Sequence, residues 1–155
     1  MRTLALVALV CACGTPDAAE PASRIGGFSY TLPDHWAQDT ARSTATSSLW
    51  APEQNTRGET LVIRVTPSAG DFKTRGRQLS RTLLASAVRG LPGEQFGPVA
   101  ELTTRHGLPE LRIEGHFAPT GAVQPYVRIH ALVLAPDQTL HVIYTAKTGD
   151  AALAG

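Results

Sequence analysis

The residues of this 155-residue chain whose types suggest chemistry are its five histidines and the carboxylates near them. His130 and His141 lie on two neighbouring segments that we predict to be strands, and Glu114 lies on the segment before them. Two imidazoles and a carboxylate are ligands that zinc accepts. Glu114, His130 and His141 are therefore weak candidates for a metal or ligand site on one sheet face. The alternative is a set of ordinary cross-strand polar pairs, because no HxxxH, HExxH or CxxC spacing accompanies them.

Other catalytic motifs are absent from the sequence. It contains no GxSxG elbow, no GxxxxGK[ST] phosphate loop, no GxGxxG and no EF-hand loop. We therefore expect no catalytic residues, no cofactor and no enzyme activity. Trp36 and Trp50 are weak candidates for a partner-binding surface, since tryptophan is enriched at binding hot spots. Packing in the core is the alternative for both side chains.

The composition excludes partners that are recruited by charge. The formal net charge is +1 and charged residues make up 17% of the chain, so no global field attracts nucleic acid. Aromatic residues amount to 6% and do not interleave with basic residues as single-stranded nucleic acid requires. The length and the 43% hydrophobic fraction fit one globular domain.

The first twelve residues have the layout of a secretory signal. Arg2 precedes the apolar run Leu4–Val10, which is shorter than the roughly 20 residues that span a bilayer. The run Val10-Cys11-Ala12-Cys13 resembles the bacterial lipobox, in which a small residue precedes a cysteine that is acylated and becomes the mature N-terminus. We predict a lipoprotein signal over 1–12 and a lipid anchor, with palmitate as one acyl chain, on Cys13. An ordinary cleavage at Ala12, or a misassigned start codon, is the alternative.

A flexible tether is predicted over 13–24, because these residues are small, weakly acidic and include prolines. Processing would leave Cys13 as the one cysteine of the mature chain, so no intramolecular disulfide is expected. Glycine at position 14 is similar to the outer-membrane sorting pattern of Gram-negative lipoproteins. We expect a protein held by its lipid at the bacterial cell envelope, at the outer membrane facing the periplasm, with an envelope protein as its partner.

Residues 25–155 are predicted to form a single α+β domain. Alternating apolar residues bounded by turn residues predict strands, which cover 28–32, 46–50, 60–66, 99–104, 110–117, 126–134 and 139–147. One helix is predicted over 72–89, since Leu79, Leu83 and Ala87 recur every four residues. Gly90 and Pro92 end this helix.

The last two predicted strands also define a register. Pairing Leu134 with Thr139 places the odd-numbered residues from Val127 to Val133 on one wholly apolar face, which must be core. Extending the alternation to the preceding strand adds its apolar residues, Leu111, Ile113 and Phe117, to this face. The same extension places Glu114 opposite His130, and the hairpin places His141 diagonal to His130.

The segment Gly27–Trp36 (GFSYTLPDHW) resembles the opening of PsbP-like and DcrB-like domains. Gly107–Ile113 and Tyr144–Ala146 are similar to later motifs of these domains, so the resemblance covers 28–147. It implies an α/β sandwich, with an antiparallel sheet of about six to seven strands packed against one main helix. It also implies an envelope lipoprotein that binds or assists other proteins without catalysis. The final helix of such domains is short or missing here, because only 148–155 follow the last strand.

Overall fold

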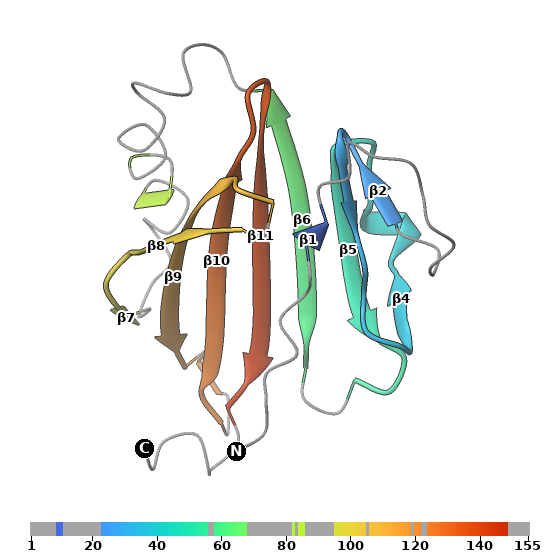
Figure 1. The fold of residues 1–155 in the computed structure, drawn as a ribbon. Helices are drawn as coiled ribbons and strands as arrows, with labels where there is room; N and C mark the ends of the chain where they lie inside the picture. Colours follow the sequence, from blue (N-terminus) through green and yellow to red (C-terminus); the bar gives the residue numbers. More distant parts are fainter. Residues whose placement is uncertain are drawn as a thin grey trace.

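The computed structural model describes residues 9–10, 23–55, 58–67, 82, 84–85, 95–104, 106–118, 120–121 and 124–148. More than half of them lie in antiparallel strands (Figure 1). The strands are β1 (Leu9–Val10), β2 (Ser23–Ile25), β3 (Phe28–Tyr30), β4 (Trp36–Gln38), β5 (Ser47–Pro52), β6 (Thr60–Pro67), β7 (Gln95–Phe96), β8 (Ala100–Thr103), β9 (Pro109–Phe117), β10 (Tyr126–Leu134) and β11 (Gln138–Lys147). A short 3-10 turn, η1 (Thr40–Arg42), lies between β4 and β5. No helix within these ranges is long and apolar enough to cross a membrane.

Eight strands form the larger sheet, in the order β4-β5-β6-β11-β10-β9-β7, with β8 also paired to β9. Its centre is the hairpin of β10 and β11, whose strands lie side by side in Figure 1. Leu134 pairs with Thr139, and Val127 pairs with Ala146. The register predicted for this hairpin is therefore confirmed.

Alternation of side chains gives this sheet two faces. We call the face that carries Ile129 the hairpin face, and the face that carries His130 the histidine face. The register predicted for β9 is wrong by one residue, because His130 pairs with Ile113 and Glu114 pairs with Ile129. A slip of one residue moves every side chain of a strand to the opposite face. Leu111 and Ile113 therefore lie on the histidine face, and Glu114 lies on the hairpin face.

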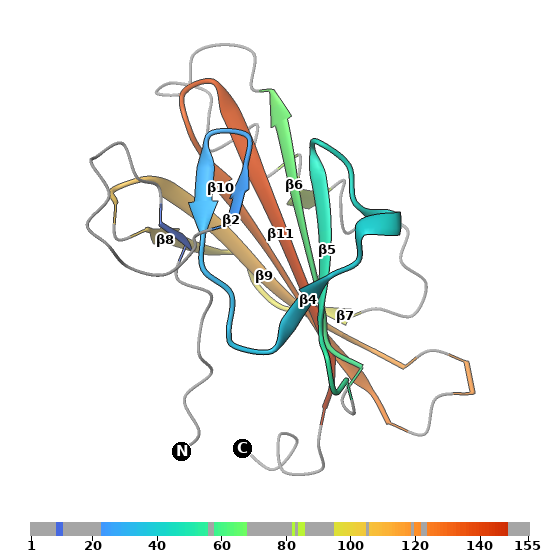
Figure 2. The same ribbon diagram turned by 90° about the vertical axis from the view of Figure 1, so that its right-hand side faces the viewer.

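A small second sheet, in the order β1-β3-β2, covers the hairpin face. Gly26 and Gly27 join β2 to β3, and φ is +56° at Gly26, as in hairpin turns with glycine at the first central position. In Figure 2 this hairpin passes in front of β10 and β11. Its buried residues join those of the larger sheet in a core cluster of Ile25, Phe28, Tyr30, Leu61, Ile63, Val65, Val133, Ala135 and Leu140.

Replacement of Gly26 by alanine is expected to destabilise the fold by more than replacement of Gly107. Both glycines have positive φ, which costs an L-residue about 1–2 kcal/mol. A Cβ at Gly26 would also lie 2.7 Å from Gln138 Oε1 and 3.0 Å from Val65 Cγ1, whereas a Cβ at Gly107 would meet nothing within 4 Å. Urea denaturation of both variants measures the difference. Equal losses in the free energy of unfolding would show that crowding at the hairpin tip has no effect.

The predicted α+β class, with one main helix packed on about six or seven strands, is wrong for the described part of the chain. This part forms two antiparallel sheets, and the larger sheet alone has eight strands. Of the helix predicted over 72–89, the structure describes Thr82, Leu84 and Ala85, which have helical backbone, and the remainder lies outside the described residues. Leu84 is fully buried on the histidine face, in a cluster with Leu111, Ile113 and Leu132. The histidine face therefore also holds a buried apolar cluster, whereas the sequence predicted only one apolar face.

Three further predicted segments also fall largely outside the described residues. Of the signal over 1–12, the structure describes only the two residues of β1. The anchor Cys13 and the tether up to residue 22 are not described, and neither is the final segment 149–155. After β1, the described residues resume at Ser23, the first residue of β2.

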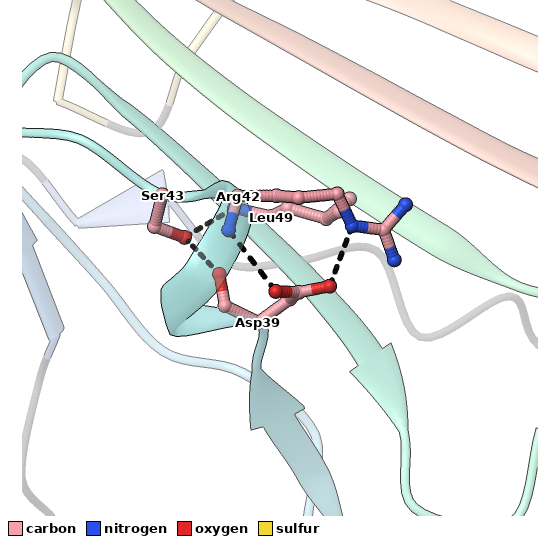
Figure 3. Close-up of polar contacts among 4 residues, drawn as sticks. All are labelled: Asp39, Arg42, Ser43 and Leu49. Carbon is pink, nitrogen blue, oxygen red and sulfur yellow. Dashed lines mark hydrogen bonds and ion pairs between the residues drawn. The ribbon is translucent and has the colours of Figure 1, made fainter.

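A polar network orders the chain between β4 and β5 (Figure 3). Asp39 caps η1, since its Oδ1 accepts the backbone N–H of Arg42 at 3.1 Å and its Oδ2 accepts Arg42 Nε at 2.6 Å. The Ser43 hydroxyl donates to the Asp39 carbonyl at 2.7 Å and accepts the Leu49 N–H at 3.1 Å. The hydrogen bond from the Arg42 side chain lowers the pKa of the Asp39 carboxyl. These contacts set the turn that returns the chain from the edge strand β4 into β5.

Candidate functional site

The histidine face brings His130 and His141 together at the centre of the larger sheet. His130 pairs with Ile143 and His141 pairs with Leu132, so the two imidazoles are diagonal neighbours on β10 and β11. Their rings stack with centroids 5.4 Å apart and an interplanar angle of 29°. His130 Nδ1 lies 3.1 Å from His141 Nε2. The sequence prediction that these two residues are diagonal neighbours is confirmed.

His130 is the more enclosed of the two residues. Only 2% of its surface is exposed, and its Nε2 has no hydrogen-bond partner within the described part of the chain. Phe96 of β7 meets its ring edge-on, with centroids 6.1 Å apart and planes at 64°. Ile113 of β9 is its cross-strand neighbour on the other side. The imidazole is therefore enclosed by apolar side chains on the sides of Phe96 and Ile113.

Both imidazoles are neutral at pH 7, because the site is buried and its neighbours are basic. Burial, followed by the charges of His141 and Arg128, lowers the pKa of His130 to about 4. Burial and the charge of Arg64, which is the cross-strand neighbour of His141, lower the pKa of His141 to about 4. We assign the shared proton to His130 Nδ1, which donates to His141 Nε2. In this tautomer the buried Nε2 of His130 is an acceptor without a partner. If His141 Nε2 donated instead, the buried Nε2 of His130 would carry an N–H without a partner.

Glu114 does not join the two histidines. It is exposed on β9, its neighbour Ile129 lies on the hairpin face, and its Oε1 lies 3.0 Å from His116 Nε2. Across the ranges that the structure describes, no group of three His, Cys, Asp or Glu side chains could hold a metal ion. The positive charges of Arg64 and Arg128 beside the imidazoles also oppose a bound cation. The geometry therefore does not favour the metal site considered from the sequence.

Three further side chains lie around the histidine pair: Arg64, Arg128 and Phe96. Alternation along 126–134 already predicts Arg128 on the face of His130, whereas sequence reasoning missed Arg64 and Phe96. Arg64 reaches this face through the pairing of β6 with β11, which local alternation does not give. Arg128 is fixed there by a Thr145 hydroxyl, which accepts its Nε at 3.2 Å, and by the ring of Phe117, 4.4 Å from its guanidinium carbon. Phe96 could not have been found, since β7 is a strand of two residues with no alternation of its own.

The chemistry open to this pair is limited at neutral pH. A general acid or base needs a pKa near the working pH and hydrogen-bond reach to a substrate. His130 has neither, because its pKa is about 4 and its ring is buried. The charge of the pair therefore changes only in acid.

The two tryptophans lie beside the core on the other face of the sheet. Trp36 and Trp50 are half-buried, and both pack against the core cluster. The ring of Trp50 meets Tyr30 edge-on, with centroids 6.1 Å apart. Tyr30 in turn places its hydroxyl 3.3 Å from the Ser48 hydroxyl. These contacts join the hairpin of β2 and β3 to the strands β4 and β5.

Comparison with known proteins identifies the fold. No family model and no curated protein sequence matches the chain. Among solved structures, LpqN of Mycobacterium tuberculosis, described as involved in cell envelope biogenesis, has a TM-score of 0.52 and 16% identity, over 88% of this chain and 78% of its own. The Ran-binding protein Mog1p of Saccharomyces cerevisiae has a TM-score of 0.50 and 9% identity, over 79% of this chain and 73% of its own. A point mutant of Mog1 has a TM-score of 0.51 and 10% identity over the same shares.

The chain has a Mog1/PsbP-like fold. At identities of 9–16% these likenesses show the fold alone. The resemblance inferred from the sequence is therefore confirmed only as far as this shared fold, because the main helix that it implied is not found among the described residues. Its PsbP-like, DcrB-like and lipoprotein details stay predictions.

Proposed function

We propose that this protein is a lipid-anchored protein of the bacterial cell envelope, with a non-catalytic binding or structural role. The observation that carries the proposal is the position of Cys13 between an apolar signal-like run and the start of the fold. The mature fold begins at Ser23, so residues 14–22 separate the anchor from the first strand of the domain. A short segment of this composition acts as a flexible spacer.

A fold neighbour supports the envelope setting. LpqN is described as involved in cell envelope biogenesis, and its fold is shared by this chain. Glycine at position 14 favours the outer membrane, where the domain would face the periplasm. The domain would then meet an envelope protein as its partner, with the acyl chains on Cys13 holding it at the bilayer.

The candidate site supports a role without catalysis. Its two imidazoles are neutral at pH 7, and the one with an unpaired nitrogen is buried. The alternative function inferred from the sequence, metal or ligand binding through a His/Glu sheet face, needs Glu114 beside the histidines. Because Glu114 lies on the other face of the sheet, we do not propose that function.

Replacement of Cys13 by serine is expected to abolish acylation and release the protein from the membrane fraction. In the native protein, mass spectrometry of the N-terminal peptide should show an acylated Cys13 as the first residue. Cys11→Ser is the matched control and should keep both the modification and the membrane association, since position 11 is removed with the signal. Recovery of the native protein in the soluble fraction without acyl groups would refute the anchor.

A further inference from the structure

The first described strand, β1, belongs to the segment that processing before Cys13 would remove. Its two residues pair antiparallel with β3, Leu9 with Tyr30 and Val10 with Ser29. β3 is the central strand of the small sheet, with β2 on its other side. In the processed protein, β3 therefore has an edge that the unprocessed chain fills with its own signal segment.

One residue of β3 supplies the backbone groups at that edge. Ile25 pairs with Phe28 around the two-residue loop, so these two residues exchange hydrogen bonds with each other. Antiparallel pairs alternate, and the N–H and C=O of Ser29 therefore point away from β2. They point to the side on which Val10 lies.

With the signal segment in place, β3 is buried: Phe28 and Tyr30 are each 1% exposed, and Ser29 is 9% exposed. A strand edge with unpaired N–H and C=O groups is a template for pairing with another chain. Removal of the signal segment takes a hydrogen-bonding partner away from Ser29 and leaves the edge open to another strand.

We propose that β3 of the processed protein binds an extended segment of an envelope partner protein, added antiparallel as a further strand. The proposal rests on the proposed function, because it requires that the signal segment is removed. Directly opposite residues share a face of a sheet, and Tyr30 faces the core cluster. The partner residue opposite Tyr30 is therefore apolar, as the leucine at position 9 is in this chain. Strand addition of this kind takes its affinity from main-chain hydrogen bonds.

The test compares the full chain with the processed chain, which begins at position 13 and carries Cys13→Ser to prevent acylation. Amide exchange at Ser29, measured by NMR, should be slow in the full chain and at least about tenfold faster in the processed chain. The probe is a peptide of residues 4–12 with Cys11→Ser and added lysines for solubility. Its addition should restore slow exchange at Ser29. Unchanged protection in β10 amides would show that the processed chain is folded.

Two methylated peptides separate strand pairing from general hydrophobic adhesion. Methylation of the amide of Val10, which faces Ser29, should weaken binding about tenfold or more, equivalent to one lost hydrogen bond of about 1.4 kcal/mol. Methylation of the amide of Leu9, which points away from β3, should have little effect. Equal binding of the two peptides would overturn the proposal.

Slow exchange at Ser29 in the processed chain without peptide would also overturn it, since the tether or a second copy of the chain would then occupy the edge. Sedimentation distinguishes these two occupants. Because the peptide test uses a recombinant processed chain, its result does not depend on acylation in the cell. Failure of the lipid anchor and failure of strand addition are therefore separate outcomes.

Discussion

Acidification from pH 7 to pH 4 is expected to destabilise this protein, with His130 as the main cause. The unfolded chain binds a proton at this imidazole near pH 6.5, whereas burial and then the charges of His141 and Arg128 hold its folded-state pKa at about 4. Between these values the unfolded state binds more protons, so the free energy of unfolding falls as the pH falls. The loss from His130 is about 3 kcal/mol, a large share of the roughly 5–15 kcal/mol that stabilises a typical domain.

His141 acts in the same direction, because its pKa is also lowered to about 4. Its contribution is smaller, since it is only half-buried and solvent screens its charge. Urea denaturation at several pH values between 7 and 4 measures the combined loss. The contribution of the two histidines to the free energy of unfolding should be complete above about pH 6.5. It should decline as the pH falls and level off below about pH 4.

His130→Phe isolates the titration from the packing. Phenylalanine keeps an aromatic ring against Phe96 but does not bind a proton. Between pH 7 and pH 4 the free energy of unfolding should therefore fall by about 3 kcal/mol less in the variant than in the native protein. His116→Gln is the control, because His116 is exposed and pairs only with exposed Glu114 among the ion pairs of the described residues. It should keep the native pH dependence. An unchanged pH dependence in His130→Phe would contradict the assignment.

Replacement of Phe28 by alanine is expected to lower the free energy of unfolding by about 3–5 kcal/mol. Its side chain is 1% exposed, in the core cluster that joins the hairpin of β2 and β3 to the larger sheet. The two strands of this hairpin have three residues each. An isolated hairpin is marginal at best in water, so it depends on this burial for its position. The substitution removes apolar contact and leaves a cavity in the cluster.

Urea denaturation followed by tryptophan fluorescence measures this loss and also reports on the hairpin itself. Trp50 contacts Tyr30 of β3, so undocking of the hairpin should change the emission even where the larger sheet remains folded. Leu102→Ala is the control, because Leu102 is 40% exposed on β8. Its effect should stay within about 0.5 kcal/mol. A loss in Phe28→Ala no greater than in Leu102→Ala would show that Phe28 does not hold the two sheets together.

The hairpin of β10 and β11 could be predicted from the sequence in both bounds and register. The turn between Leu134 and Thr139 is short, and a short turn leaves one pairing of the flanking strands. Several other predicted strands agree with β5, β6, β8 and β9 to within about two residues. Local alternation and turn residues are enough for these features, because both act between neighbours in the chain.

The candidate site could be predicted only in part, for the same reason. The closeness of His130 and His141 depends on the short hairpin, and that prediction is confirmed. The position of Glu114 depends on the register of β9, which is joined to β10 by the longer segment 118–125. A longer connection allows more than one pairing, and a shift of one residue places Glu114 on the other face.

Local patterns in the sequence predict the longer strands, the alternation along them and the closeness of the two histidines, but not the short strands β1, β2, β4 and β7. The face that each strand presents to a partner depends on tertiary contacts. Leu111 and Ile113 had to be buried, but their face is set by Leu84, which comes from a distant part of the chain and packs with them. The hairpin of β2 and β3 covers the opposite face in the same way. Alternation specifies that one side of a strand is buried, and the element that covers it decides which side of the sheet that is.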